Sequence, residues 1–514
     1  MGEETKSYRP IGAIIAERAA RHPDKTYVHS IEQDKSLTYG DLHRLGNRMA
    51  GYLGDRGLAA NDRVFMLSEN SVEFMAVFLG VQRFGATIAT ANVEMNRDHI
   101  AEIVRAVAPK LVLVQDGLGL EGLVEEAGAA WMPLGEWHAE GASSGFFAEL
   151  ESYADDAEIE QVCGPEDIAV IFYTSGTEAK PKGVLQPHRS VWANFDGIAE
   201  IVEIGEDDRM LECRSYTWLS SQNMTLGAPL VAGATVYMAK RFSRSRYFDW
   251  IRDYRITIAT SVPTILNMLM TEPVDIHGRD LPDLRFLMTS SAPMLPERWR
   301  EFEDMYGITV CQSYGCSEAG LMCSHPGAAR KIGTVGRPLK HQILRLLDAE
   351  GAEVAIGEPG EITVSGPQLA AGYLGPEGTV EPLPQSGHRT GDLGVRDADG
   401  HIAIVGRLKE VIIRGGVNIS PVEIDNVLSR HPEIVEGATI GIPDKIYGEA
   451  VVAYVVARSG SRLSSEEVIA HCGQYLAPFK TPKAIRFVDA LPRNARGKLD
   501  RETLVASWRE AASA

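Results

Sequence analysis

Residues 173–184 gather side chains that could bind a polyanion. They read YTSGTEAKPKGV and follow the apolar segment IAVIF (168–172), which is typical of a buried strand. A loop delivered by a strand can present backbone N–H groups, hydroxyls and ammonium charge to phosphate, and a triphosphate is the obvious ligand. The stretch is not a Walker A loop, because Pro181 stands where that pattern needs the Gly before its Lys. An ordinary solvated loop is the alternative.

This stretch resembles the phosphate-loop signature of the adenylate-forming superfamily, which includes acyl-CoA synthetases, peptide-synthetase adenylation domains and luciferases. The resemblance covers roughly residues 10–505, with further motifs in the family's order. It implies that the loop binds ATP phosphates, with Thr177 also near the reacting phosphate and Mg²⁺. The loop residues it assigns to this role are Thr174, Ser175, Gly176, Thr177, Lys180 and Lys182.

The segment VCQSYGCSEAG (310–320) resembles the family's Tyr-Gly-x-Thr-Glu motif, with Ser317 in place of threonine. The resemblance places the Tyr314 ring against adenine, Ser317 near the α-phosphate and Glu318 on Mg²⁺. Magnesium prefers hard oxygen ligands, commonly a carboxylate together with substrate phosphates. Outside such a motif, a glutamate is usually a solvent-exposed charge. The neighbours assigned to the same nucleotide site are Ser313, Gly315 and Cys316.

Two shorter motifs complete the expected nucleotide site. SSAPM (290–294) resembles the family segment beside adenine and the acyl group, and it contributes Ser291, Ala292 and Pro293. HRTGDLG contains Asp392, which by resemblance accepts hydrogen bonds from both ribose hydroxyls, a role that suits a carboxylate. An aspartate in a hairpin turn is the alternative for an isolated Gly-Asp pair.

The segment VGRLKEVIIRGGVNISPVEID (405–425) resembles the family's hinge. The resemblance implies that Arg407 contacts ribose or phosphate and that the C-terminal domain pivots at Lys409. Gly415 and Gly416 would let the backbone approach pantetheine. Ser420 with Glu423 predicts a helix start of the capping-box type.

The end of the chain carries LPRNARGKLDR, which resembles the family's Pro-Arg-x-x-x-Gly-Lys motif. Lys498 is then the mobile lysine of adenylation. A cation is useful there because negative charge develops between the carboxylate and the α-phosphate. Without the motif, a lysine near the end of a chain is almost always solvent-exposed.

The segment 210–238 is expected to build the acyl pocket, because it resembles the family region that ends in Gly-Ala before a strand. Trp218 falls where many aryl-CoA ligases carry histidine. A tryptophan at this point could be core or could line the pocket, and its face could stack on an aromatic or a cationic group. The sequence leaves these readings open. The residues assigned to the substrate pocket are Trp218, Ser220, Gln222 and Ser313.

Composition limits the class of protein. The chain has 514 residues, 44% of them hydrophobic, which suggests a globular protein of two to four domains. Its net charge of −19 argues against nucleic acid or an anionic membrane as the main partner. The six cysteines form no C-x-x-C pair, so we expect reduced thiols and a cytoplasmic location. The sequence shows no signal-peptide core and no apolar run long enough for a membrane span.

Alternating apolar strand and helix patterns predict an α/β fold of parallel βαβ units. We expect a large N-terminal domain (1–405) of such sheets flanked by helices plus a small β subdomain, a hinge (406–410), and a small mobile α+β C-terminal domain (411–514). Helices are predicted at 10–21, 36–53 (with Thr38 as N-cap) and 242–255. His188 could start a helix or line a site.

The sequence also leaves other functions open. Gly117, Gly119 and Gly122 match the dinucleotide fingerprint of nicotinamide-dependent oxidoreductases, but the following LVEEAGAAWMP is too short and broken for its helix. A stand-alone adenylation enzyme that loads a carrier protein, a luciferase-like oxidase and a non-catalytic binding protein are further alternatives.

The resemblance favours an AMP-forming acid–CoA ligase that uses ATP, Mg²⁺ and coenzyme A. The acid would attack the α-phosphorus of ATP to give acyl-AMP and pyrophosphate. The small domain would then rotate, and the thiol of CoA would displace AMP. The expected substrate is a small or medium acid, either aryl or a carnitine-like betaine. Homo-oligomers are common in the family, but this sequence does not reveal one.

Overall fold

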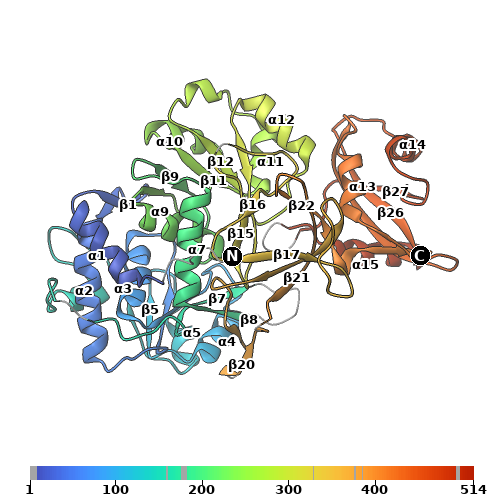
Figure 1. The fold of residues 1–514 in the computed structure, drawn as a ribbon. Helices are drawn as coiled ribbons and strands as arrows, with labels where there is room; N and C mark the ends of the chain where they lie inside the picture. Colours follow the sequence, from blue (N-terminus) through green and yellow to red (C-terminus); the bar gives the residue numbers. More distant parts are fainter. Residues whose placement is uncertain are drawn as a thin grey trace.

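The computed structural model describes residues 8–157, 160–174, 182–327, 329–375, 378–384, 386–493 and 498–513. Figure 1 shows a large body built from most of the chain and a smaller body, built from the last strands and helices, beside it. Within the described residues, no helix has the length and apolar character needed to cross a membrane.

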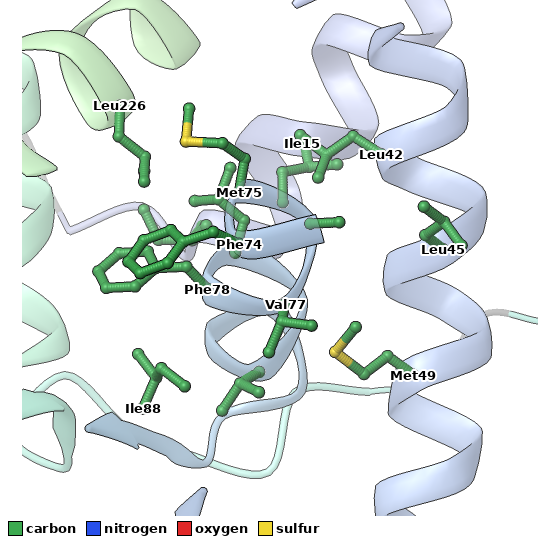
Figure 2. Packing of buried hydrophobic residues seen from close by; sticks show 14 of the residues in the cluster. Ile15, Leu42, Leu45, Met49, Phe74, Met75, Val77, Phe78, Ile88 and Leu226 are labelled. Carbon is green, nitrogen blue, oxygen red and sulfur yellow. The ribbon is translucent and has the colours of Figure 1, made fainter. Parts of the chain in front are cut away.

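Three N-terminal helices form one side of the large body: α1 (Ile11–Arg21), α2 (Tyr39–Asp55) and α3 (Val72–Phe84). As predicted, Thr38 caps α2: its hydroxyl accepts from the Asp41 N–H at 3.0 Å, and its own N–H donates to the Asp41 carboxylate at 3.1 Å. Such a cap stabilises a helix by about 1 kcal/mol. Figure 2 shows side chains of α1, α2 and α3 packed together with Leu226, so these helices support the expected acyl-pocket region.

One sheet carries the strands on either side of the phosphate loop, in the order β20-β19-β8-β7-β4-β3-β5-β6. β3, β4, β5 and β7 run parallel, whereas β7 and β8 form an antiparallel hairpin from Ile168↔Pro187 to Thr174↔Lys182. The two ends of segment 175–181 therefore lie side by side. The strands are β3 (Arg63–Leu67), β4 (Thr87–Thr90), β5 (Leu111–Val114), β6 (Trp131–Pro133), β7 (Ile168–Thr174), β8 (Lys182–Pro187), β19 (Gly372–Leu374) and β20 (Val380–Pro382). The helices that follow in sequence are α4 (Arg97–Val107), α5 (Glu121–Glu126), α6 (Gly145–Leu150) and α7 (His188–Ile201).

A second sheet has the order β13-β12-β11-β9-β10-β1-β2 and is parallel except for β2. The carboxyl ends of its parallel strands meet at one edge, where α/β proteins commonly bind ligands. The strands are β1 (Thr26–Ser30), β2 (Lys35–Thr38), β9 (Arg209–Glu212), β10 (Thr235–Met238), β11 (Ile258–Ser261), β12 (Phe286–Thr289) and β13 (Val310–Gln312). Its helices are α8 (Leu219–Ser221), a π-helix (Gln222–Gly227), α9 (Ala228–Ala232), α10 (Tyr247–Asp253), α11 (Pro263–Thr271) and α12 (Pro296–Tyr306).

The β subdomain and the small body follow. The subdomain contains β14 (Tyr314–Cys316), β15 (Gly320–Ser324), β16 (Arg337–Pro338), β17 (Ile343–Leu347), β18 (Pro359–Ser365), β21 (His388–Arg396) and β22 (Ile402–Arg407). The small body contains β23 (Ile412–Arg414), β24 (Val417–Ile419), β25 (Ile434–Asp444), β26 (Gly448–Ala457), β27 (Ile485–Phe487), α13 (Pro421–Leu428), α14 (Ser465–Tyr475) and α15 (Arg501–Ser513). This arrangement confirms the predicted α/β fold with a small α+β unit at its end. The exact domain limits at 405 and 411 stay a prediction.

Two local predictions were partly wrong, although α13 does start after Ser420 as expected. The helix expected at 242–255 begins only at Tyr247 and ends at Asp253, because Arg246 turns back onto Ser243 and Arg255 has a positive φ of 52°. The capping box expected at Ser420 is absent: the Ser420 hydroxyl donates instead to the Val405 carbonyl, and Glu423 pairs with Lys480 at 2.7 Å. The Ser420 hydroxyl and the Glu423 carboxylate each bind a residue distant in the sequence, which the local pattern did not reveal.

Candidate functional site

A cavity of about 320 Å³ lies where the large and small bodies meet. It is lined by residues that are distant in the sequence but were predicted to share one site. Those residues are Ser291, Ala292, Pro293, Ser313, Tyr314, Gly315, Asp392, Arg407 and Lys498. Strand ends of the second sheet, the β subdomain and the small body all contribute to this wall.

Asp392 is held between an aromatic hydroxyl and a guanidinium. Tyr314 Oη donates to Asp392 Oδ2 at 2.6 Å, and Arg407 Nε lies 2.6 Å from Asp392 Oδ1. The β21–β22 register places Asp392 opposite Arg407. Burial and the nearby Asp392 charge raise the pKa of Tyr314, so its hydroxyl keeps its proton and remains a donor. The Asp392 carboxyl group is thus buried and oriented at the cavity wall.

Glu318 lies in the turn between β14 and β15 and contacts β19, the strand paired with β8. Tyr373 Oη, from β19, donates to Glu318 Oε1 at 2.7 Å, and the Lys182 ammonium lies 6.0 Å from the centre of the Tyr373 ring. Burial and the Glu318 charge raise the pKa of Tyr373. His388 Nε2 is 3.8 Å from the other Glu318 oxygen.

The donor set around Glu318 can be tested against Mg²⁺. Ligand atoms of Cys316, Glu318 and His388 lie within 4.8 Å of one another. A thiol and an imidazole suit softer metals, whereas the partly exposed carboxylate fits an ion that takes one protein carboxylate and completes its shell with phosphates and water. Of these three residues, Glu318 fits Mg²⁺, whereas Thr177, the other residue predicted near the metal, lies outside the part of the chain that the structure describes.

Part of the predicted phosphate loop lies outside the described residues, namely Ser175, Gly176, Thr177 and Lys180. The structure does place the two ends: Thr174 closes β7 opposite Lys182, which opens β8. The Ser317 carbonyl next to Glu318 accepts from the Gln186 side chain at 2.9 Å, which ties β8 to the Tyr314–Glu318 segment.

The residues predicted to act in the second half-reaction lie on exposed turns. Lys409 stands in a 3₁₀ turn (Leu408–Glu410), and its Nζ lies 3.8 Å from Glu502. Gly415 and Gly416 form the β23–β24 turn with φ of 59° and 82°, values that favour glycine. Their position in a turn is explained by this geometry without any contact to a ligand.

The expected substrate-pocket residues come from one irregular segment. Trp218 is half-buried and precedes α8, while Gln222 opens the π-helix, is buried and donates to the Tyr216 carbonyl at 2.8 Å. Ser313 shares a 2.9 Å hydrogen bond with Ser324. Ser220 Oγ lies 3.5 Å from Arg214 Nη1, a residue that the sequence analysis did not single out.

Arg214 forms a buried ion pair with Glu212, which closes β9. The Arg214 and Glu212 side chains are 2% and 0% exposed, and Arg214 Nη2 lies 2.6 Å from Glu212 Oε2. Burial disfavours both charges, yet their mutual attraction and hydrogen bonds lower the pKa of Glu212 and raise that of Arg214. The signal in the sequence was a charged Glu-Cys-Arg at the end of an apolar strand.

Two further sequence hypotheses are resolved. His188 is the first residue of α7 and is buried, so it starts a helix, and burial lowers its pKa to about 4. The glycine fingerprint at Gly117 leads into α5, which has 6 residues, rather than into the long helix that a dinucleotide site needs.

Comparison with known protein families shows the family to which this chain belongs. The model described as AMP-binding enzyme matches residues 15–374, and the model described as AMP-binding enzyme C-terminal domain matches residues 423–498. The chain belongs to the AMP-binding enzyme family. The nicotinamide-dependent interpretation is therefore wrong.

Individual members of the AMP-binding enzyme family align over almost the whole chain. It is 34% identical over 509 residues to a sulfoacetate–CoA ligase from Cupriavidus necator, covering 98% of each protein. It is 31% identical over 514 residues to an oxalate–CoA ligase from Arabidopsis thaliana, covering 97% of this chain and 99% of the relative. ATP-bound MatB from Rhodopseudomonas palustris has a similar structure, with a TM-score of 0.85 at 27% identity and 97% and 99% coverage.

Membership in this family confirms the reaction class. The protein is an AMP-forming acid–CoA ligase that activates a carboxylic acid with ATP and Mg²⁺ and transfers it to CoA. The cavity between the two bodies collects the aromatic, carboxylate and cationic groups described above.

Proposed function

We propose that the cavity binds ATP and the acid together, with each predicted residue in the role that its position allows. The Tyr314 ring contacts adenine and the oriented Asp392 carboxylate accepts from ribose hydroxyls. Arg407 holds Asp392 and reaches ribose or phosphate. Lys498 stabilises charge as the carboxylate attacks the α-phosphorus. The hairpin loop that ends at Lys182 holds the other phosphates.

Glu318 would hold Mg²⁺, which on binding neutralises phosphate charge. The Tyr373 hydroxyl keeps the Glu318 carboxylate aimed at the phosphate side, since it donates to one oxygen and leaves the other available. The role of this chain in the metal site is therefore to supply one oriented carboxylate next to the β7–β8 hairpin.

The single observation that carries this proposal is the position of Lys498 in the wall of the cavity that Tyr314 and Asp392 also line. Tyr314 and Asp392 belong to the β subdomain of the large body, whereas Lys498 belongs to the small body. This is the arrangement that adenylation requires, because a cation must reach the reacting carboxylate and α-phosphate.

The second half-reaction would require the small body to turn about Lys409. Its contacts with α12 of the large body include a 3.3 Å hydrogen bond from Ser429 Oγ to Glu297 Oε2 and two partly exposed ion pairs, Arg430 Nε to Glu297 Oε1 at 3.4 Å and Arg458 Nη2 to Glu301 Oε1 at 3.6 Å. Exposed pairs of this kind are each worth about 0–1 kcal/mol, so they can be released without a large barrier.

We also propose that the substrate is a short, polar acid. Trp218 is half-buried, but the pocket segment beside it presents Ser220 and a guanidinium, which suits polar oxygen better than a long chain or a quaternary ammonium group. The sulfoacetate and oxalate ligases among the relatives act on short acids with a second anionic group. This argues against the betaine reading of the sequence, whereas the aryl reading keeps support from an indoleacetate–CoA ligase and a feruloyl-CoA synthase among the relatives.

The proposal is tested by pyrophosphate release across a panel of acids, each with and without CoA. Acid-dependent release that turns over repeatedly only with CoA supports the ligase. Release that stops after one turnover in the presence of CoA would point to a carrier protein as the acceptor. Failure of every acid, together with failure to bind ATP in a titration, would overturn the proposal.

The cellular location and the oligomeric state are also part of the proposal. A cytoplasmic location is supported by the six free cysteines, which fit a reducing compartment. A homo-oligomer stays a proposal from the family resemblance alone, and light scattering on the purified protein would test it.

A further inference from the structure

The Glu212–Arg214 pair lies among the strand ends that form the ligand-binding edge of the second sheet. Glu212 closes β9, Thr260 lies in β11 and Ser290 directly follows β12. Thr260 Oγ1 donates to Glu212 Oε1 at 2.9 Å, and Arg214 Nη1 donates to Ser290 Oγ at 3.2 Å. Ser290 precedes Ser291, which lines the central cavity. The pair therefore stands directly behind the cavity wall, beside the expected acyl pocket.

Both carboxylate oxygens of Glu212 accept several hydrogen bonds, and together they orient the Arg214 guanidinium. Its Oε1 accepts from the backbone N–H groups of Cys213 and Arg214 and from Arg214 Nε at 3.0, 2.8 and 2.9 Å. Its Oε2 accepts from Arg214 Nη2 at 2.6 Å and from Thr225 Oγ1 at 2.7 Å. These bonds consume the Nε–Nη2 edge of Arg214 and fix the plane of the guanidinium.

The opposite edge of Arg214 points elsewhere. Nη1 is directed at two serine hydroxyls, Ser220 at 3.5 Å and Ser290 at 3.2 Å. Ser220 belongs to the segment predicted to line the acyl pocket, and a hydroxyl can either accept from Arg214 or donate to a ligand. Nη1 with these two serines thus forms a compact set of donors for an oxygen-rich group.

An irregular helix beside the pair contributes a hydrogen bond to Glu212. Thr225 lies in the π-helix Gln222–Gly227, an irregular element that often occurs at functional sites and that brings its hydroxyl onto Glu212. A buried ion pair gives little stability over an apolar pair of the same volume, so stability alone does not explain its presence.

We infer that Arg214 recognises a second, anionic group at the far end of the acyl substrate, such as a sulfonate or carboxylate, and that Glu212 is the positioning residue for it. This rests on the proposed function as a short-acid ligase. An anion near Nη1 is closer to the guanidinium than to Glu212, so attraction exceeds repulsion. A cationic betaine would meet the reverse balance.

The experiment compares kcat/KM for sulfoacetate and malonate with that for propionate and glycine betaine, in the wild type and in E212Q/R214M. The double variant avoids leaving Glu212 buried without its partner. Gln at 212 keeps an acceptor for the backbone amides, and the threonine hydroxyls have carbonyl acceptors as well, Ser221 at 3.0 Å and Leu211 at 2.9 Å. R214K serves as a charge-retaining variant.

We expect the wild type to prefer the dianionic acids by at least tenfold, and E212Q/R214M to lose that preference because its kcat/KM falls at least tenfold more for sulfoacetate and malonate than for propionate. R214K should fall in between, because it keeps the charge but loses the planar fork. The matched control is R209M, in the same strand but paired with Asp283 away from the pocket. Its selectivity should equal that of the wild type.

Two outcomes would overturn the inference. One is a wild type that prefers propionate or betaine, and the other is an E212Q/R214M variant that folds, by its melting temperature, yet keeps the dianion preference. If no acid at all supports pyrophosphate release by the wild type, the proposed function fails first. If pyrophosphate release is supported only by acids that lack a second anionic group, this inference fails while the proposed function stands.

Discussion

The Tyr314 hydroxyl donates a 2.6 Å hydrogen bond to Asp392, although 78 positions separate the two residues in the sequence. The bond joins the motif expected at adenine to the motif expected at ribose. Because Arg407 binds the other oxygen of the same carboxylate, Asp392 is held from both sides before any nucleotide arrives. Such preorganisation reduces the entropy that ordering would otherwise cost on binding.

Replacing Tyr314 with Phe should therefore weaken ATP binding while leaving the ring in place. The loss of one hydrogen bond to the carboxylate predicts a rise in KM for ATP of roughly three- to tenfold with little change in kcat. Steady-state pyrophosphate release measures both. Y306F is the control, because the Tyr306 hydroxyl donates to the Leu269 carbonyl in the core. An equal rise in that control would contradict the assignment.

Lys498→Ala should cripple acyl-AMP formation by roughly 10²–10³-fold, as expected for the loss of one group that stabilises developing charge. Thioester formation from supplied acyl-AMP and CoA should be spared. The two half-reactions are measured separately by pyrophosphate release and by thiol consumption. Lys483→Ala is the matched control, since Lys483 lies on the same small body and pairs with Asp444. An equal loss of rate in both half-reactions would contradict the prediction that Lys498 acts only in acyl-AMP formation.

Glu318→Gln should raise the Mg²⁺ concentration needed for half-maximal pyrophosphate release and lower the maximal rate by roughly 100-fold, because the amide carries no charge for the metal. A magnesium titration at fixed ATP checks this. The exposed Glu381→Gln variant, on β20, should behave as the wild type. An unchanged magnesium dependence in the Glu318 variant would remove the metal assignment.

Lys409→Pro should let acyl-AMP accumulate without passing it to CoA. Proline removes a backbone N–H and fixes φ near −65°, which restricts rotation about the expected hinge. Quenched-flow detection of bound acyl-AMP checks the result. Lys409→Ala removes the side chain but keeps backbone freedom, so it should turn over normally. Normal turnover in the proline variant would eliminate the hinge role.

Stability should fall as the pH drops below neutrality, partly through His188. Burial lowers its pKa from 6.5 to about 4, so below pH 6.5 the unfolded state binds a proton that the folded state refuses. The free energy of unfolding should lose about 2 kcal/mol from this residue by pH 5. Urea unfolding at pH 7 and pH 5 should show a smaller difference for H188Q than for the wild type. The exposed His138→Gln control should show the full difference.

Much of the local structure could be predicted from the sequence, because the signals are local. The apolar run before the phosphate loop is β7, and Thr38 caps α2. Each depends on residues within about one helical turn or one strand. The motifs carrying Tyr314, Asp392 and Lys498 were likewise visible as short sequence patterns.

Where tertiary partners compete, the local pattern failed. Ser420 has the sequence of a helix cap, but its hydroxyl bonds to Val405, which only the folded β22 brings near. Likewise the segment 242–255 was predicted to form one helix, but turns at both ends shorten α10 to Tyr247–Asp253.

The sequence by itself determined the family and the reaction class, and it predicted most of the residues that we propose around the nucleotide, since these are carried by contiguous motifs. Only the tertiary structure decided how Asp392 is oriented and that Glu212 and Arg214 form a buried pair pointing at Ser220 and Ser290. The physical reason is that parallel strands far apart in the chain end at one edge of a sheet. Which side chains meet there depends on strand order and register, and no short pattern encodes either.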